Sequence, residues 1–125
     1  MSEIFFLQQA PFVVPTTDGK LIEEHVGRIA TDETNLSVAH MVAPPGWSEP
    51  HQNPEFDEYT LMVRGRKQIE INGETVILKS GESLLVRKGV RVQYSNPFEE
   101  EAEYWSVCIP AFSPESVNRE NDSST

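Results

Sequence analysis

Short stretches in which apolar and polar residues alternate recur along this chain about every eight to twelve residues. The clearest one runs from Glu58 to Val63, where Glu58, Thr60 and Met62 alternate with Tyr59, Leu61 and Val63. A β-strand points successive side chains to opposite faces. The pattern therefore predicts a strand that turns Glu58 toward the interior.

Further strands are predicted at 21–30, 36–42, 68–71, 75–78, 83–86, 90–94 and 104–109. Asn72-Gly73 lies between two alternating runs and predicts a type I′ hairpin turn. No segment of helical length carries apolar residues at 3.6 spacing, although Ser113 followed by Pro114 predicts one short helical turn near the end. The fold class is therefore all-β, a sandwich or barrel.

The two ends of the chain differ from this regular pattern. Residues 4–14 are mostly apolar, but Pro11 and Pro15 disfavour both a helix and a central strand. Residues 1–15 are expected to form an edge strand or an arm against a partner subunit. Residues 120–125 have nothing to bury and are expected to be disordered. The chain of 125 residues is thus one domain spanning 1–119.

Charge and cysteine content narrow the classes of partner. Asp and Glu number 20 against 10 Lys and Arg, a formal charge of −10, which repels phosphate backbones and anionic lipid. We therefore expect neither nucleic acid nor membrane as a partner. The single cysteine, Cys108, cannot form an internal disulfide, and its strand position predicts a buried, inert thiol. No signal peptide or long apolar run is recognised, and a cytoplasmic location is expected.

Two groups of residues in the middle of the chain have a familiar spacing. The first is Gly46, His51, Glu58 and Gly65, and the second is Gly81, Gly89 and Asn96. This stretch resembles the cupin superfamily, which implies a jelly-roll barrel, the double-stranded β-helix. The resemblance also implies a metal site with four usual ligands. His51 and Glu58 occupy two of those positions, whereas Asn53 and Val92 occupy the other two.

The resemblance implies a barrel pocket that brings His51 and Glu58 together. Its expected lining is His51, Asn53, Glu58, Arg64, Val92 and Tyr94. A divalent metal ion (Mn, Fe, Zn or Ni) would be held by His51, Glu58 and Asn53, with His40 as a further candidate ligand. Glu58 is the candidate catalytic general base. Arg64 shares the parity of Glu58 and either enters the barrel or lies exposed at the strand end.

Two functions follow from this incomplete ligand set. In the first, the protein binds a small organic ligand, such as a carboxylate or sugar, without the full metal set. The alternative is a metal-dependent enzyme of the isomerase, decarboxylase or dioxygenase type that acts on a small oxygen-rich substrate. Unpaired apolar edges also predict a homodimer, because an exposed strand edge can pair with another chain.

Overall fold

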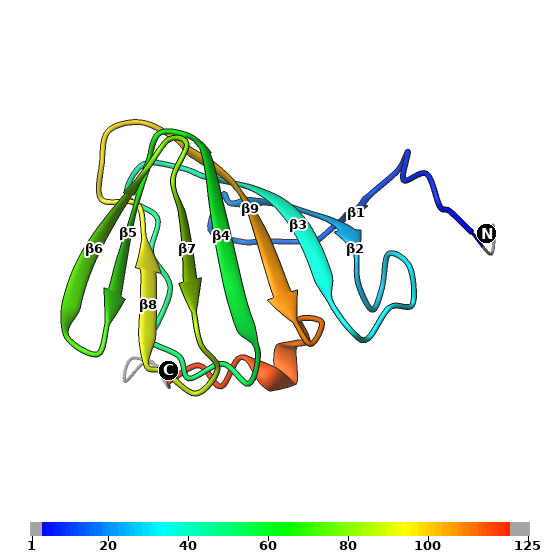
Figure 1. The fold of residues 1–125 in the computed structure, drawn as a ribbon. Helices are drawn as coiled ribbons and strands as arrows, with labels where there is room; N and C mark the ends of the chain where they lie inside the picture. Colours follow the sequence, from blue (N-terminus) through cyan, green and yellow to red (C-terminus); the bar gives the residue numbers. More distant parts are fainter. Residues whose placement is uncertain (1–3, 121–125) are drawn as a thin grey trace.

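The computed structural model describes residues 4–120, which fold into two antiparallel β-sheets that face each other (Figure 1). The larger sheet has the strand order β1-β2-β3-β9-β4-β7, and the smaller has the order β6-β5-β8. The bounds are β1 Phe12–Val13, β2 Leu21–Val26, β3 Ser37–Ala43, β4 Asp57–Arg64, β5 Arg66–Ile71, β6 Glu74–Lys79, β7 Ser83–Val86, β8 Val92–Ser95 and β9 Ala102–Ile109. The all-β class predicted from the alternation is confirmed, and so is the jelly-roll barrel implied by the resemblance.

Strand β4 shows how the alternating pattern builds the core. Thr60 and Met62 are buried, whereas Leu61 and Val63 are 43% and 47% exposed on the other face. The same rule buries Ile69 on β5 and Tyr94 on β8 between the two sheets. The interior therefore receives one side chain in two from each strand.

The hairpin between β5 and β6 has the predicted geometry. Asn72 and Gly73 both have positive φ, at 47° and 87°, as a type I′ turn requires. Ile71 pairs with Glu74 directly beside the turn. The predicted strand over 21–30 is shorter than expected and ends at Val26, because the following residues loop around the carboxylate of Glu24, which accepts hydrogen bonds from the Ile29 and Ala30 amides.

The N-terminal segment supplies an edge strand. Phe12 of β1 pairs with Glu24 of β2, while the described residues before β1, from Ile4 on, extend away from the sheets (Figure 1). At the other end, the short helical turn η1 (Pro114–Ser116) has Ser113 at its N-cap and Pro114 at its first position, as predicted. Glu120 is ordered, because its amide donates to the His51 carbonyl at 2.8 Å. The rest of the expected tail, 121–125, lies outside the described residues.

None of the helical structure within residues 4–120 has the length and hydropathy needed to cross a lipid bilayer.

Candidate functional site

A cavity of about 620 Å³ lies inside the barrel, between the larger sheet and strands β5 and β8. Its apolar wall comes from β1 to β3, from Phe56 directly before β4 and from the C-terminal segment, and includes Phe12, Ile22, Met41, Phe112 and Val117. Its polar wall includes, from β4, β5, β8 and β9, the side chains of Glu58, Lys67, Tyr94, Ser106 and Cys108. A volume of this size suits a small organic molecule.

Glu58 lies in this cavity beside two small polar side chains of β9. Its Oε2 accepts a hydrogen bond from Ser106 Oγ at 2.7 Å. Cys108 also lines the cavity, and burial, followed by the charge of Glu58, raises the pKa of its thiol well above the usual value. A neutral, buried thiol agrees with the inert cysteine predicted from the sequence.

The polar wall also contains a lysine that the sequence analysis missed. Lys67 is 1% exposed, and its Nζ lies 4.3 Å from the ring centroid of Tyr94 and 3.7 Å from that of Tyr104. Within residues 4–120, no carboxylate oxygen comes within 4.0 Å of this ammonium group. Lys67 shares the parity of Ile69 and Ile71, which is the signal that could have revealed its inward direction.

A second buried lysine lies nearer the N-terminal segment. Lys20 Nζ lies 4.1 Å from the centroid of the Trp47 ring. Burial opposes its charge, but Tyr104 and the carboxylates of Glu49 and Glu58 outweigh this effect and raise the pKa of Lys20. Lys20 is therefore a cation that the protein's own groups compensate.

Polar atoms without partners remain around this interior. The Oε1 of Gln52 and the hydroxyls of Tyr94 and Tyr104 accept or donate no hydrogen bond within residues 4–120. Gln52 and Tyr94 both line the cavity. Burial and the charges of Glu58 and Glu49 raise the pKa of Tyr94 well above its usual value, so its hydroxyl stays protonated.

His51 lies elsewhere than the sequence analysis expected. Its Nε2 is 3.3 Å from Glu70 Oε1, and no hydrogen bond or ion pair in the described chain joins it to Glu58. The reason is the pairing of its neighbour. The backbones of Gln52 and Val92 exchange hydrogen bonds at 2.9 Å, so Gln52 shares the inward face of Val92 and the adjacent His51 turns outward. Gln52, not His51, therefore lines the cavity.

The other expected ligands are also separated from the cavity. Asn53 lies at the surface, where its Nδ2 donates to the Gly89 carbonyl at 3.4 Å. Val92 is fully buried in the core and offers no donor atom. His40 lies on the outer face of β3, because Ser37, Ala39 and Met41 take the inward parity, and it bridges Glu23 and Glu103 at 2.8 and 2.7 Å.

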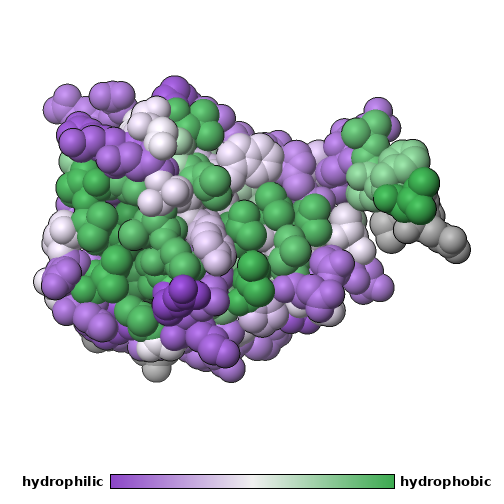
Figure 2. Space-filling model, in the orientation of Figure 1, coloured by the Kyte–Doolittle hydropathy of each residue, from purple (hydrophilic) through white to green (hydrophobic). Residues whose placement is uncertain are grey.

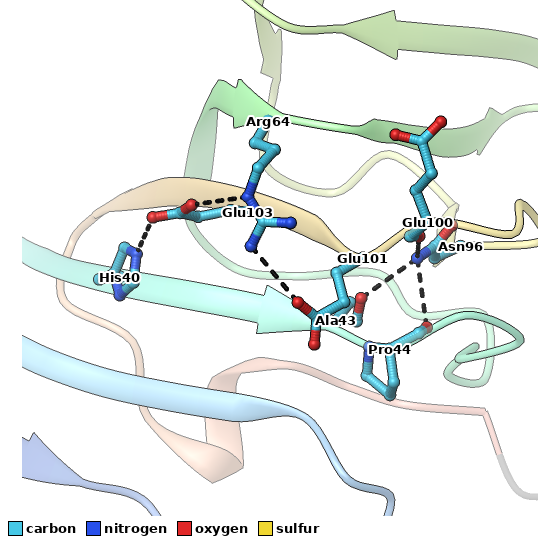
Figure 3. Close-up of polar contacts among 8 residues, drawn as sticks. All are labelled: His40, Ala43, Pro44, Arg64, Asn96, Glu100, Glu101 and Glu103. Carbon is cyan, nitrogen blue, oxygen red and sulfur yellow. Dashed lines mark hydrogen bonds and ion pairs between the residues drawn. The ribbon is translucent and has the colours of Figure 1, made fainter.

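Arg64 does not enter the barrel. A β-bulge between Met62 and Arg64 breaks the alternation that relates it to Glu58. Its side chain is half exposed and pairs with Glu101 and Glu103 at 3.4 and 3.2 Å (Figure 3). The sequence left two positions open for Arg64, inside the barrel or exposed at the strand end, and the structure places it at the exposed strand end.

The residues of this chain do not fit the metal centre implied by the resemblance. Within residues 4–120, no three His, Cys, Asp or Glu side chains lie close enough together to hold a metal ion. His51 is paired with Glu70, and Glu58 with Ser106. Most catalytic metal sites need about three protein ligands and an open position.

Comparison with known proteins agrees with this fold. Residues 39–109 match the family model for the cupin domain. Over 108 residues, the chain is 47% identical to the endoribonuclease YbeY of Myxococcus xanthus strain DK1622. The matched region covers 86% of this chain and 37% of that protein. The chain thus spans about a third of this relative's length.

Two solved structures resemble the chain in fold. Oxalate decarboxylase from Bacillus subtilis has a TM-score of 0.75 and 21% identity, over 91% of this chain and 31% of that one. A variant of Streptomyces PAC13 with uridine has a TM-score of 0.75 and 13% identity, over 96% of this chain and 92% of that one. At these identities the likeness is one of fold.

Proposed function

This chain belongs to the cupin family, and from the contents of its barrel we propose that it binds a small organic molecule there without the family's usual metal set. The observation that carries the proposal is the pair of unpartnered polar groups on the cavity wall, Gln52 Oε1 and the Tyr94 hydroxyl. A buried polar atom without a hydrogen bond is costly, and a ligand that bonds to it removes that cost.

The arrangement of acidic and imidazole groups supports binding without a metal. Glu58 is the one residue of the expected ligand triad, His51, Glu58 and Asn53, that lines the cavity. As a carboxylate held by Ser106, it accepts a hydrogen bond from a ligand more readily than it completes a metal site. If the ligand is turned over, Glu58 is our candidate general base.

The solved relatives give limited support for the class of ligand. The structure of the Streptomyces PAC13 variant, a chain of similar length, was determined with uridine, which supports a small organic molecule as the ligand. The activities named for the oxalate decarboxylase and the endoribonuclease are not transferred, because this chain spans 31% and 37% of those proteins.

Thermal-shift screening of a metabolite library against the full chain, with and without EDTA, tests the proposal. A ligand at about 100 times its Kd stabilises the folded state by about 2.7 kcal/mol, a rise in Tm of about 10 °C for a chain of this length. We expect this rise to persist in EDTA. A rise that disappears in EDTA and returns with a divalent metal would instead support the metal-dependent enzyme.

Gln52→Leu provides the matching variant, with Gln68→Leu as its control. Gln52 lines the cavity, whereas Gln68 lies between the inward-facing Lys67 and Ile69 and points to the other face. The Gln52 variant is expected to reduce the ligand-induced rise in Tm, and the Gln68 variant to leave it unchanged. Equal rises in both variants would place the ligand outside this cavity.

We also propose that two copies of the chain associate through the N-terminal arm. Phe5, Phe6 and Leu7 are 67%, 48% and 68% exposed, and Figure 2 shows apolar surface on this projecting segment. Exposed apolar groups of this kind gain by burial against a partner. Light scattering on the full chain should give the mass of a dimer, and Phe5→Ser with Leu7→Ser should give that of a monomer. A wild-type monomer at about 100 μM would contradict the proposal.

A further inference from the structure

Lys67 is a buried cation whose nearest partners are aromatic rings. Its side chain is 1% exposed, and its Nζ lies close to the faces of Tyr94 and Tyr104. Cation–π contacts compensate part of the cost of removing an ammonium group from water, but an anion compensates more. The cavity is the free space that Lys67 lines.

The other cations on the cavity wall already have partners. Arg28 Nε donates to the Ala111 carbonyl at 3.4 Å, and Arg119 pairs with Glu49 at 3.6 Å. Lys20 is compensated by Glu49 and Glu58. Lys67 thus lines the cavity with no carboxylate within 4.0 Å and no hydrogen bond to a carbonyl among residues 4–120.

We propose that the ligand is a small organic acid whose carboxylate is bound by Lys67. This inference rests on the proposed function and names the chemical class of its ligand. The carboxylate accepts a hydrogen bond from Nζ, and the rings of Tyr94 and Tyr104 hold the ammonium group in position. Lys67 is therefore a specificity-determining residue for an anion.

The other residues that line the cavity indicate which further chemical groups the ligand carries. Gln52 Oε1 is an unpartnered acceptor, so it calls for a donor such as a hydroxyl group. The apolar wall formed by Phe12, Ile22 and Phe56 favours a ligand with an apolar body that packs against these side chains. The ligand that satisfies all three features is a hydroxylated carboxylic acid with an aliphatic or aromatic body.

Calorimetry with matched probes tests the inference. The probes are lactate, 4-hydroxybenzoate and 4-hydroxyphenylacetate, each measured beside its primary amide against the full chain. The amide keeps the shape of the acid and removes its charge. Loss of one hydrogen bond to a charged group is expected to weaken binding roughly 10- to 100-fold, so at least one acid should bind that much more tightly than its amide.

Lys67→Met removes the ammonium group and keeps the length of the side chain. The same acid should bind this variant roughly 10- to 100-fold more weakly, whereas its amide should bind as it does to the wild type. Lys79→Met is the control, because Lys79 is exposed at the end of β6. This variant should keep the wild-type affinity for the acid.

Acids and amides that bind equally well, or acid binding that Lys67→Met leaves unchanged, would overturn the inference while the proposed function stands. The same holds if neutral metabolites raise the Tm and none of the three acids binds. If no metabolite and no acid binds, both proposals fail. Should Lys67→Met not fold, the acid-to-amide ratio of the wild type decides alone.

Discussion

Asn96 joins three parts of the barrel through one buried side chain. Its Nδ2 donates to the carbonyls of Ala43, Pro44 and Glu100 at 3.1, 3.2 and 2.8 Å (Figure 3). Its Oδ1 accepts from the Phe98 amide at 3.2 Å. The residue is 0% exposed, so water cannot replace these bonds. Asn96→Ala should therefore destabilise the fold strongly.

The expected magnitude follows from these contacts. Two N–H donors and one acceptor are lost, at about 0.5–1.5 kcal/mol for each bond, and the carbonyls left behind are buried, so the total is about 3–4 kcal/mol. The entropy of unfolding for a chain of this length is about 0.26 kcal/mol/K. The Tm should fall by about 12–15 °C.

Thermal melts followed by circular dichroism measure this change. Asn53→Ala is the matched control, because Asn53 is only half-buried and its side chain makes one long bond to the Gly89 carbonyl, and the Tm of this variant should change by about 2 °C or less. Asn96→Asp should be at least as damaging as the alanine variant, since a carboxylate turns an acceptor toward three carbonyl oxygens. An Asn96→Ala melt within about 3 °C of wild type would refute this reasoning.

Three further predictions concern the backbone, the outer face and the thiol. Gly65→Ala should destabilise by more than about 2 kcal/mol in urea titrations, because Gly65 has φ 77° and an added Cβ would lie 2.1 Å from the Glu101 carbonyl oxygen. Gly81→Ala, at a similar φ but with open space around it, should cost about 1 kcal/mol, and equal losses would contradict the steric argument. Burial opposes the charge of His40, but its hydrogen bonds with Glu103 and Glu23 raise its pKa. The contribution of protonated His40 to stability should therefore be complete below about pH 6.5 and decrease as the pH rises through the folded-state pKa. The difference in Tm between wild type and His40→Gln should thus shrink between about pH 6 and 9. A difference that grows over this range would contradict the prediction. Burial raises the pKa of Cys108, so its reaction with Ellman's reagent at pH 8 should be at least about 100-fold slower in the native protein than in urea, and equal rates would exclude a buried thiol.

Local patterns in the sequence were sufficient for the class of fold. The alternation at Glu58–Val63, the Asn72-Gly73 turn and the Ser113-Pro114 start each depend on residues within a few positions of one another. Their physical causes are the period of a strand, the positive φ of a type I′ turn and the fixed φ of proline. These causes act wherever the residues occur, and the structure has each of these elements.

The contents of the cavity depended on pairings between distant strands. Gln52 faces inward because it pairs with Val92, 40 positions later, and this pairing turns His51 toward Glu70. Likewise, Arg64 leaves the inward face because β4 has a bulge against β9. One residue of register exchanges the two faces of a strand, and the spacing of a motif does not specify that residue.

The sequence by itself thus determined an all-β fold with Glu58 on an inward-facing position, and the resemblance added the barrel and a place for Tyr94 in its pocket. Only the tertiary structure decided that their neighbours are Lys67, Gln52 and Ser106, and that the histidines lie outside the cavity. The direction of a side chain on one strand is a local property. Which side chains surround it in the cavity depends on the register of every strand that forms the barrel.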